Sequence, residues 1–266
     1  MYKKSNFDFS VIKIFFIASH FSFRCRKNKQ HCLLEKPIFN SNSTKMNRLD
    51  FTLDELENSR FENHYHELIK QMVKQTQFNE IEVKSILMIY YKFLLKNGKK
   101  SKSMTKQQFF SLFKVLFRIY DLQIIERILL HLTSDLKKEV DPIAWVKLFS
   151  VFMSSKLIPK MKFVFNIYNT KESGWLSREN VMHAVDKFFT GDDEDEVNEL
   201  RADMIEVIFR KFDTDRDGFI SYEEYSAVVT KEPLYLEFLG MCLPSFTGKT
   251  VIAYCANIMS RIEKIY

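Results

Sequence analysis

From about residue 52 onward, apolar residues recur at a spacing that places them on one face of a helix. A solvated polar run at 96–103 ends the clearest stretch, which covers 80–95. Its broad apolar face consists of Ile81, Ile86, Leu87, Tyr90, Tyr91 and Leu94. Thr105 and Gln108 then have the spacing of a capping box at the start of the next helix. The pattern predicts a chain that is helical nearly throughout.

A helix, a short polar loop and a second helix recur three more times further along the chain. We number these loops by their order: the second loop is 133–144, the third is 169–180 and the fourth is 213–224. Their flanking helices are predicted at 123–132 and 145–153, at 160–168 and 181–189, and at 200–212 and 225–231. An acidic insert at 191–196, interpreted as a solvated connector, lengthens the last interval. Repetition of one unit predicts a fold built from helix–loop–helix hands.

The fourth loop fits every informative position of the twelve-residue calcium loop of an EF-hand. Calcium prefers about six to eight oxygen ligands, including a bidentate glutamate at the last position. Gly218 allows the sharp turn that a Cβ would obstruct, and Ile220 is expected to form a short strand with the neighbouring loop. The predicted ligands of one Ca²⁺ ion are Asp213, Asp215, Asp217, the carbonyl of Phe219, Ser221 and Glu224. The alternative is an acidic surface turn that only resembles the pattern.

The second and third loops have lost the residues that hold an ion. In the third loop, Lys171 places an ammonium where a ligand belongs, and Asn180 cannot bind as a bidentate carboxylate. In the second loop, Lys138 replaces the glycine and Ala144 has no side-chain oxygen, although Val140 keeps the strand position. We therefore expect these loops to pair with their neighbours and to bind no metal.

The formal net charge of +6 comes from the beginning of the chain. Residues 1–45 hold nine Lys/Arg and two acidic residues, and removing them from the totals of 40 and 34 leaves 31 basic and 32 acidic residues in 46–266. The body of the chain therefore lacks the positive surface that binds phosphate backbones, and we expect no nucleic acid partner.

Residues 1–45 also differ from the rest in pattern. Lys13 interrupts the apolar run 11–18, and basic residues follow where a signal-peptide cleavage site would lie. A secretory signal, a transit peptide, a disordered extension and translated sequence upstream of the true start remain open, and we favour the last two. Met46 is the alternative initiator, because the sequence after it fits the helical pattern.

Three further features indicate where the chain resides and what it does not do. No stretch approaches about 18 consecutive apolar residues, so we expect no membrane insertion. The four cysteines lack paired spacing, which favours free thiols in a reducing, cytoplasmic compartment. No phosphate-cradling glycine loop and no nucleophile beside a base is visible, so we expect no enzymatic activity.

Two smaller features have ordinary interpretations. His64 and His66 lack a partner cluster with zinc spacing and are interpreted as surface histidines. The aromatic stripe Phe109, Phe110, Phe113 and Phe117 is interpreted as core, although an open EF-hand lobe also presents such side chains to a target helix.

The expected fold class is all-α: a two-lobed EF-hand protein with four helix–loop–helix units and short β pairings between paired loops. We expect a basic extension at 1–45, and then an N-terminal lobe at 46–155 with degenerate hands 1 and 2. The C-terminal lobe at 156–232 holds degenerate hand 3 and intact hand 4, and a tail follows at 233–266.

Several segments outside the fourth loop carry a family resemblance. They are Met46-Asn47-Arg48, Phe78-Asn79 with Glu82-Val83, Trp145, the acidic insert, Leu236-Glu237-Phe238, and Cys242-Leu243-Pro244. With the fourth loop, these segments resemble the calaxin family of EF-hand proteins, which is related to neuronal calcium sensors and calcineurin B. The resemblance covers most of 46–266.

The resemblance implies a calcium-binding accessory protein of the outer dynein arm in the axoneme of a cilium or flagellum. The implied partner is a dynein heavy chain or the outer-arm docking complex, and the implied role is to modulate dynein when calcium rises. The six ligands carry over residue by residue. The chain departs from the family in its degenerate second and third loops, and a single site cannot bind calcium cooperatively.

Two alternatives remain open on this sequence. The first is a structural EF-hand adaptor that holds a permanent Ca²⁺ or Mg²⁺ ion and does not switch. The second is a cytosolic regulator of the neuronal-sensor or calcineurin B type. N-myristoylation in the neuronal-sensor class requires a glycine at the second position, but Tyr2 follows Met1 and Asn47 follows Met46.

The tail around Phe238–Phe246 is expected to occupy an apolar groove of the C-terminal lobe in the absence of a partner.

Overall fold

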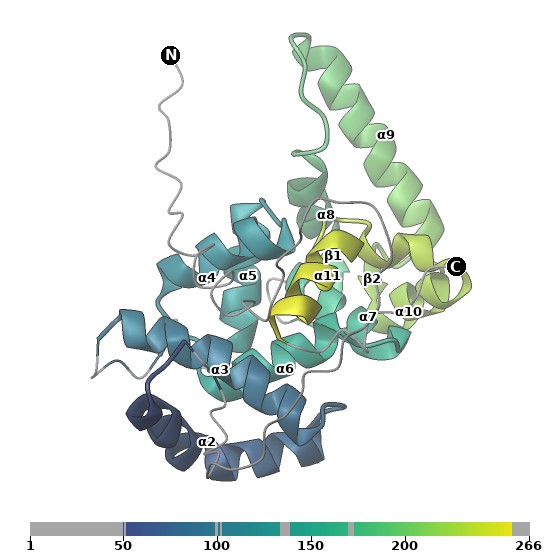
Figure 1. Cartoon of the computed structure of the whole chain (residues 1–266). Helices are drawn as coiled ribbons and strands as arrows, with labels where there is room; N and C mark the ends of the chain where they lie inside the picture. The colour runs from purple at the N-terminus through teal and green to yellow at the C-terminus, as the bar shows by residue number, and fades with distance from the viewer. Residues whose placement is uncertain are drawn as a thin grey trace, which may run out of the picture.

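The computed structural model describes residues 50, 52–98, 101, 103–133, 139–169 and 173–256 (Figure 1). The predicted extension at 1–45 lies outside these residues. The elements, in chain order, are α2 (Glu55–Gln75), α3 (Glu80–Lys96), α4 (Lys106–Leu112), the π-helical turn η1 (Phe113–Phe117), α5 (Leu122–Leu132), α6 (Pro142–Phe152), α7 (Leu157–Tyr168), β1 (Trp175–Ser177), α8 (Arg178–Val185), α9 (Glu194–Phe212), β2 (Phe219–Ser221), α10 (Tyr222–Lys231), the 3-10 turn η2 (Pro233–Glu237) and α11 (Phe246–Cys255).

The helices form four consecutive helix–loop–helix hands, which are α3–α4, α5–α6, α7–α8 and α9–α10. In the third and fourth hands, β1 and β2 pair antiparallel, with Leu176 opposite Ile220. In the first and second hands, an isolated antiparallel bridge joins Met104 to Val140. The predicted all-α EF-hand fold is confirmed, and so are the strand positions predicted at Ile220 and Val140.

Side-chain caps fix where the hands begin and end. The capping box predicted at Thr105 and Gln108 is present at the start of α4. Equivalent capping boxes join Ser177 to Asn180 in α8 and Ser221 to Glu224 in α10. The prediction that the helix after the third loop begins at 181 was therefore wrong, because this capping box starts α8 three residues earlier, at Arg178.

The acidic insert at 191–196 is exposed, as predicted for a solvated connector, but the helix that follows it starts earlier than predicted. The side chain of Asp193 accepts hydrogen bonds from the backbone amides of Asp195 and Glu196, and so α9 begins at Glu194 rather than near 200. Acidic residues in a first turn favour this start, because they face the positive end of the helix dipole. In Figure 1 the N-terminal half of α9 extends away from the other helices.

A continuous core of aromatic and aliphatic side chains crosses the boundary predicted at 155. The ring of Phe152 in α6 lies 5.0 Å from that of Phe117 and 5.9 Å from that of Phe163 in α7, measured between centroids. Phe109, Phe113 and Phe117 are fully buried and Phe110 is half-buried against them, which confirms the interpretation of this stripe as core. Aromatic pairs stabilise a fold by more than the burial of their apolar area alone would give. This cluster therefore helps to hold the first two hands against α7.

The chain before the first hand also belongs to the fold. Helix α2 packs against α3, and the carboxylate of Asp50 lies 2.5 Å from the ammonium of Lys92 on α3. Asn58 binds the backbone of Asp50 in both directions, through a donated and an accepted bond of 2.9 Å each. None of the described helices combines the length and the apolar character that crossing a bilayer requires.

Candidate metal centre

The fourth loop is held between α9 and α10 by its backbone. Phe212 ends α9, and Ile220 in β2 is fully buried where it pairs with Leu176. Gly218 has a φ of 84°, and Arg216 has a φ of 61°. Both values lie in the left-handed region, which is sterically unfavourable for any residue that carries a Cβ. The glycine at the sixth loop position therefore fills the role predicted for it.

Three of the predicted ligands converge in this loop. One carboxylate oxygen from each of Asp213, Asp215 and Glu224 lies within 4.8 Å of the other two. Oxygens that bind one calcium ion at about 2.3–2.6 Å are separated by at most about 5 Å, so this spacing fits a common ion. Among the described residues, no other group of three His, Cys, Asp or Glu side chains meets this spacing.

Glu224 joins the two ends of the loop. Its Oε1 accepts hydrogen bonds from the backbone amide and the hydroxyl of Thr214, at 2.7 and 2.9 Å. Its Oε2 accepts from the amide and the hydroxyl of Ser221, both at 2.9 Å. Burial alone would raise the pKa of Glu224, but the hydrogen bonds from Ser221 and Thr214 outweigh it and lower the pKa to about 2. The last ligand is therefore ionised and in place at neutral pH.

Backbone amides orient the aspartates. Asp213 accepts hydrogen bonds of 3.1 Å from the amides of Asp217 and Gly218, one at each carboxylate oxygen. Asp215 accepts from the amide of Asp217 at 3.1 Å, and Asp217 accepts from that of Phe219 at 2.8 Å. These bonds are formed within the loop and hold the acidic side chains close together, where a cation offsets their mutual repulsion.

The other three predicted ligands are not part of this group of carboxylates. Asp217 lies in the loop but outside the group of three, and the hydroxyl of Ser221 donates to Glu224. Phe219 lies in β2, opposite Ser177. The assignments of Asp217, the Phe219 carbonyl and Ser221 as ligands stay predictions.

The third loop closes through hydrogen bonds equivalent to those of the fourth, but with neutral amide oxygens in place of carboxylates. The Oδ1 of Asn180 accepts from the amide and the hydroxyl of Ser177, at 3.0 and 2.8 Å. The Oδ1 of Asn169 accepts from the amide of Ser173 at 3.3 Å. Both asparagines are buried, so their amide oxygens are satisfied within the protein. Lys171, on which part of the prediction rested, lies outside the described residues.

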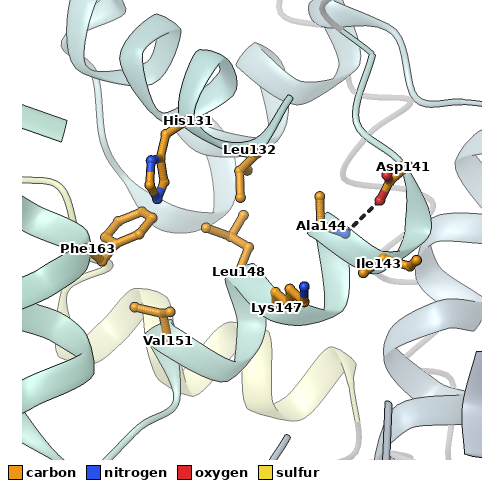
Figure 2. A pocket seen from close by; sticks show the side chains of 9 residues that line it. All are labelled: His131, Leu132, Asp141, Ile143, Ala144, Lys147, Leu148, Val151 and Phe163. Carbon is orange, nitrogen blue, oxygen red and sulfur yellow. Dashed lines mark hydrogen bonds between the residues drawn. The ribbon is translucent and has the colours of Figure 1, made fainter. Parts of the chain in front are cut away.

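The second loop ends in a similar way. Asp141 caps α6 by accepting a 2.7 Å hydrogen bond from the amide of Ala144, which occupies the last loop position. Figure 2 shows this bond at one side of a hollow of about 350 Å³ between α5, α6 and α7. Leu148 and Phe163 line it together with His131, and among the described lining residues Asp141 alone carries a carboxylate. These described residues therefore offer no metal ligand set. Lys138 lies outside the described residues.

The sequence interpretation missed two neighbours of the metal loop. Thr214 donates twice to Glu224, although the second loop position carries no ligand in the calcium pattern. The ring of Trp175 packs edge-on against that of Phe219, with centroids 5.8 Å apart and both rings partly exposed. The predicted pairing of the third and fourth loops was the one signal that pointed to this contact. His64 and His66, predicted to be surface residues, are exposed.

Comparison with known proteins agrees with this geometry. Residues 158–230 match the family model described as an EF-hand domain pair. Calaxin of Xenopus laevis is 26% identical over 202 residues, which span 75% of this chain and 95% of that protein. Calaxin of Homo sapiens is 27% identical over 172 residues, which span 63% of this chain and 81% of that protein.

Calaxin of Danio rerio is 27% identical over 180 residues, which cover 66% of this chain and 85% of the relative. The matched EF-hand family is not a known family of enzymes, and the calaxins do not belong to one. The hands, the convergent carboxylates and the matches lead to one conclusion. The chain is a calcium-binding EF-hand protein of the calaxin type.

Proposed function

We propose that the protein is a calcium-responsive accessory protein of the outer dynein arm, acting in the axoneme of a cilium or flagellum through one functional EF-hand. The convergence of Asp213, Asp215 and Glu224 in the fourth loop is the observation that carries the calcium part of this proposal. The similarity to calaxin over most of the chain supports the axonemal part. The proposed partner is a dynein heavy chain or the outer-arm docking complex.

The position of the ligands suggests how ion binding changes the protein. Asp213 follows the last residue of α9, and Glu224 lies in the first turn of α10. When both side chains hold one ion, they fix the end of α9 relative to the start of α10. In sensor EF-hands, calcium binding changes the angle between the two helices of a hand and exposes an apolar surface to a partner.

The chemistry of the other two loops supports a single functional loop. In the third loop, Asn169 and Asn180 place neutral amides where the fourth loop has the carboxylates of Asp213 and Glu224, and Ala144 ends the second loop without a side-chain oxygen. A protein with a single site responds to calcium without cooperativity between sites. The response then extends over a wider range of calcium concentration than it does in a protein with paired sites.

A structural adaptor is the second candidate, because the hydrogen-bonded loop is already ordered around Glu224. In that case, the fourth loop holds Ca²⁺ or Mg²⁺ permanently and the partner binds regardless of free calcium. A cytosolic regulator of the neuronal-sensor or calcineurin B type is the third candidate. Location separates it from the first two, since it predicts no enrichment in cilia.

The test is co-sedimentation of the full-length protein with purified axonemal outer arms, in calcium and in a chelator. The proposal predicts an interaction whose strength differs between the two conditions, and a Glu224→Gln variant that behaves in calcium as the wild type does in chelator. Equal sedimentation of both proteins in both conditions favours the adaptor. Absence of sedimentation in every condition contradicts the axonemal proposal.

A further inference from the structure

The tail that follows α10 places an aromatic side chain against the third and fourth hands. The ring of Phe238 stacks on that of Phe212, with centroids 4.3 Å apart and planes 26° apart. It also lies 5.6 Å from the ring of Tyr168, edge-on, and 6.0 Å from that of Tyr225. Three helices, α7, α9 and α10, therefore build the site that holds Phe238.

Two tyrosine hydroxyls bind the backbone of the same segment. The Tyr225 hydroxyl donates to the carbonyl of Leu236 at 2.7 Å. The Tyr168 hydroxyl donates to the carbonyl of Gly240 at 2.7 Å and accepts from the amide of Leu239 at 3.3 Å. Both tyrosine rings are buried, so releasing the tail leaves their hydroxyls without these partners, which is costly.

The residues that hold the tail are the immediate neighbours of the metal ligands. Phe212 precedes Asp213, the first predicted ligand, and Tyr225 follows Glu224, the last. A movement of either ligand therefore moves a ring that touches Phe238. Stacked rings have a specific geometry and cores are densely packed, so a change in the angle between α9 and α10 alters these contacts.

The far part of the tail reaches η1, which directly follows α4 of the first hand. Helix α11 packs against η1 so closely that a Cβ on Gly248 would lie 3.2 Å from the carbonyl oxygens of Leu116 and Phe117. Ile252 of α11 is buried. The η1 segment is a π-helical turn that ends at Arg118 with a φ of 55°, a left-handed conformation unusual for this residue.

The segment between these two anchors is braced internally. The Oε1 of Glu237 accepts hydrogen bonds from the amides of Cys242 and Leu243, at 2.6 and 2.7 Å. Leu239, Cys242 and Leu243 are buried. A braced segment passes a displacement from one end to the other more effectively than a flexible chain does.

We propose that residues 233–256 carry the ion-dependent change from the fourth hand to η1 in the first hand, so that one metal site controls both halves of the protein. This inference rests on the proposed calcium response and adds to it a route and a responding element. It assigns the tail a role as a coupling segment between hands. In this arrangement, hands that lack metal ligands respond to calcium that is bound in the fourth loop.

The experiment measures amide hydrogen exchange on the full-length protein in calcium and in chelator, with calorimetry on the same samples. In the wild type, calcium is expected to change exchange in 233–243 and in 113–118 by about fivefold or more, the lower end of usual coupling between sites. Phe238→Ala is expected to bind calcium and to lose the change in 113–118. Leu234→Ala is the control, because this tail side chain is 97% exposed.

Two milder variants guard against a folding defect in Phe238→Ala. Tyr168→Phe and Tyr225→Phe keep the rings and remove the hydroxyls that bind the tail, so each is expected to reduce the change in 113–118. The inference is overturned if calcium binds but leaves exchange in 113–118 unaltered, or if Phe238→Ala keeps the full change. If the wild type gives no calcium heat, the proposed calcium response itself is wrong.

Discussion

The carboxylate of Glu224 accepts a 2.7 Å hydrogen bond from the backbone amide of Thr214, ten residues earlier in the chain. This bond ties the first turn of α10 to the start of the fourth loop. It also places the last predicted ligand beside Asp213 and Asp215, within 4.8 Å of each. The loop is thus arranged around its acidic side chains by its own amides and hydroxyls, before any ion is considered.

The pKa of Glu224 gives a prediction for the protein in chelator. The group has a pKa of about 2 in the folded loop and an ordinary value of 4.5, so the folded state favours its ionised form. The stabilisation is fully present above about pH 4.5 and is lost as pH falls toward 2. Unfolding measured against pH should show the wild type more stable than Glu224→Gln at pH 6, with the difference closing in this window. A difference that does not change from pH 6 to 2 contradicts the assigned cause.

The left-handed backbone at Gly218 predicts a position-specific effect. Gly218→Ala is expected to lower the free energy of unfolding by about 1–2 kcal/mol, because an L side chain is strained at a φ of 84°. Gly98, with a φ of 96° and equally open surroundings, is the matched control. Denaturant unfolding should show similar losses for Gly98→Ala and Gly218→Ala, whereas calorimetry should show weaker calcium binding for Gly218→Ala alone. Equal calcium affinity in both variants would contradict the role of Gly218 in the metal loop.

The ion pair of Asp50 and Lys92 predicts that the chain before α2 is needed for stability. The side chains are 13% and 8% exposed, so Asp50→Ala leaves an ammonium buried without its counter-charge. The expected loss is about 3–5 kcal/mol. Glu67→Ala breaks the exposed pair with Lys70 and should cost less than about 1 kcal/mol. Thermal unfolding compares the stability of the two variants. Similar losses of stability would show that the buried pair stabilises the fold no more than the exposed pair does.

The sequence predicted the features that depend on local pattern. The left-handed turn at Gly218, the strand residues Val140 and Ile220, and the Thr105 capping box all lie where the pattern placed them. Each rests on residues a few positions apart, so backbone geometry and side-chain hydrogen bonds decide them with little help from the rest of the molecule.

Features that depend on distant contacts were not predictable in the same way. The contact of Phe238 with Phe212 and Tyr225 requires three helices to meet, and the sequence supported only a general expectation of an apolar groove. The π-helical turn η1 and helix α11 pack against each other, and neither has a sequence signal that we recognised. The start of α9 was misplaced because the capping role of Asp193 was hidden inside an acidic run.

We propose that the fourth loop binds calcium as a single, responsive site. Calorimetric titration of the full-length protein with calcium, with and without about 1 mM magnesium, tests it beside Glu224→Gln and the neighbouring exposed control Glu223→Gln. We expect one site with a dissociation constant in the sensor range of about 10⁻⁷–10⁻⁵ M, which is kept in magnesium and in Glu223→Gln and lost in Glu224→Gln. Saturation of the loop by magnesium, or the absence of any measurable heat of calcium binding, would contradict a single, responsive calcium site.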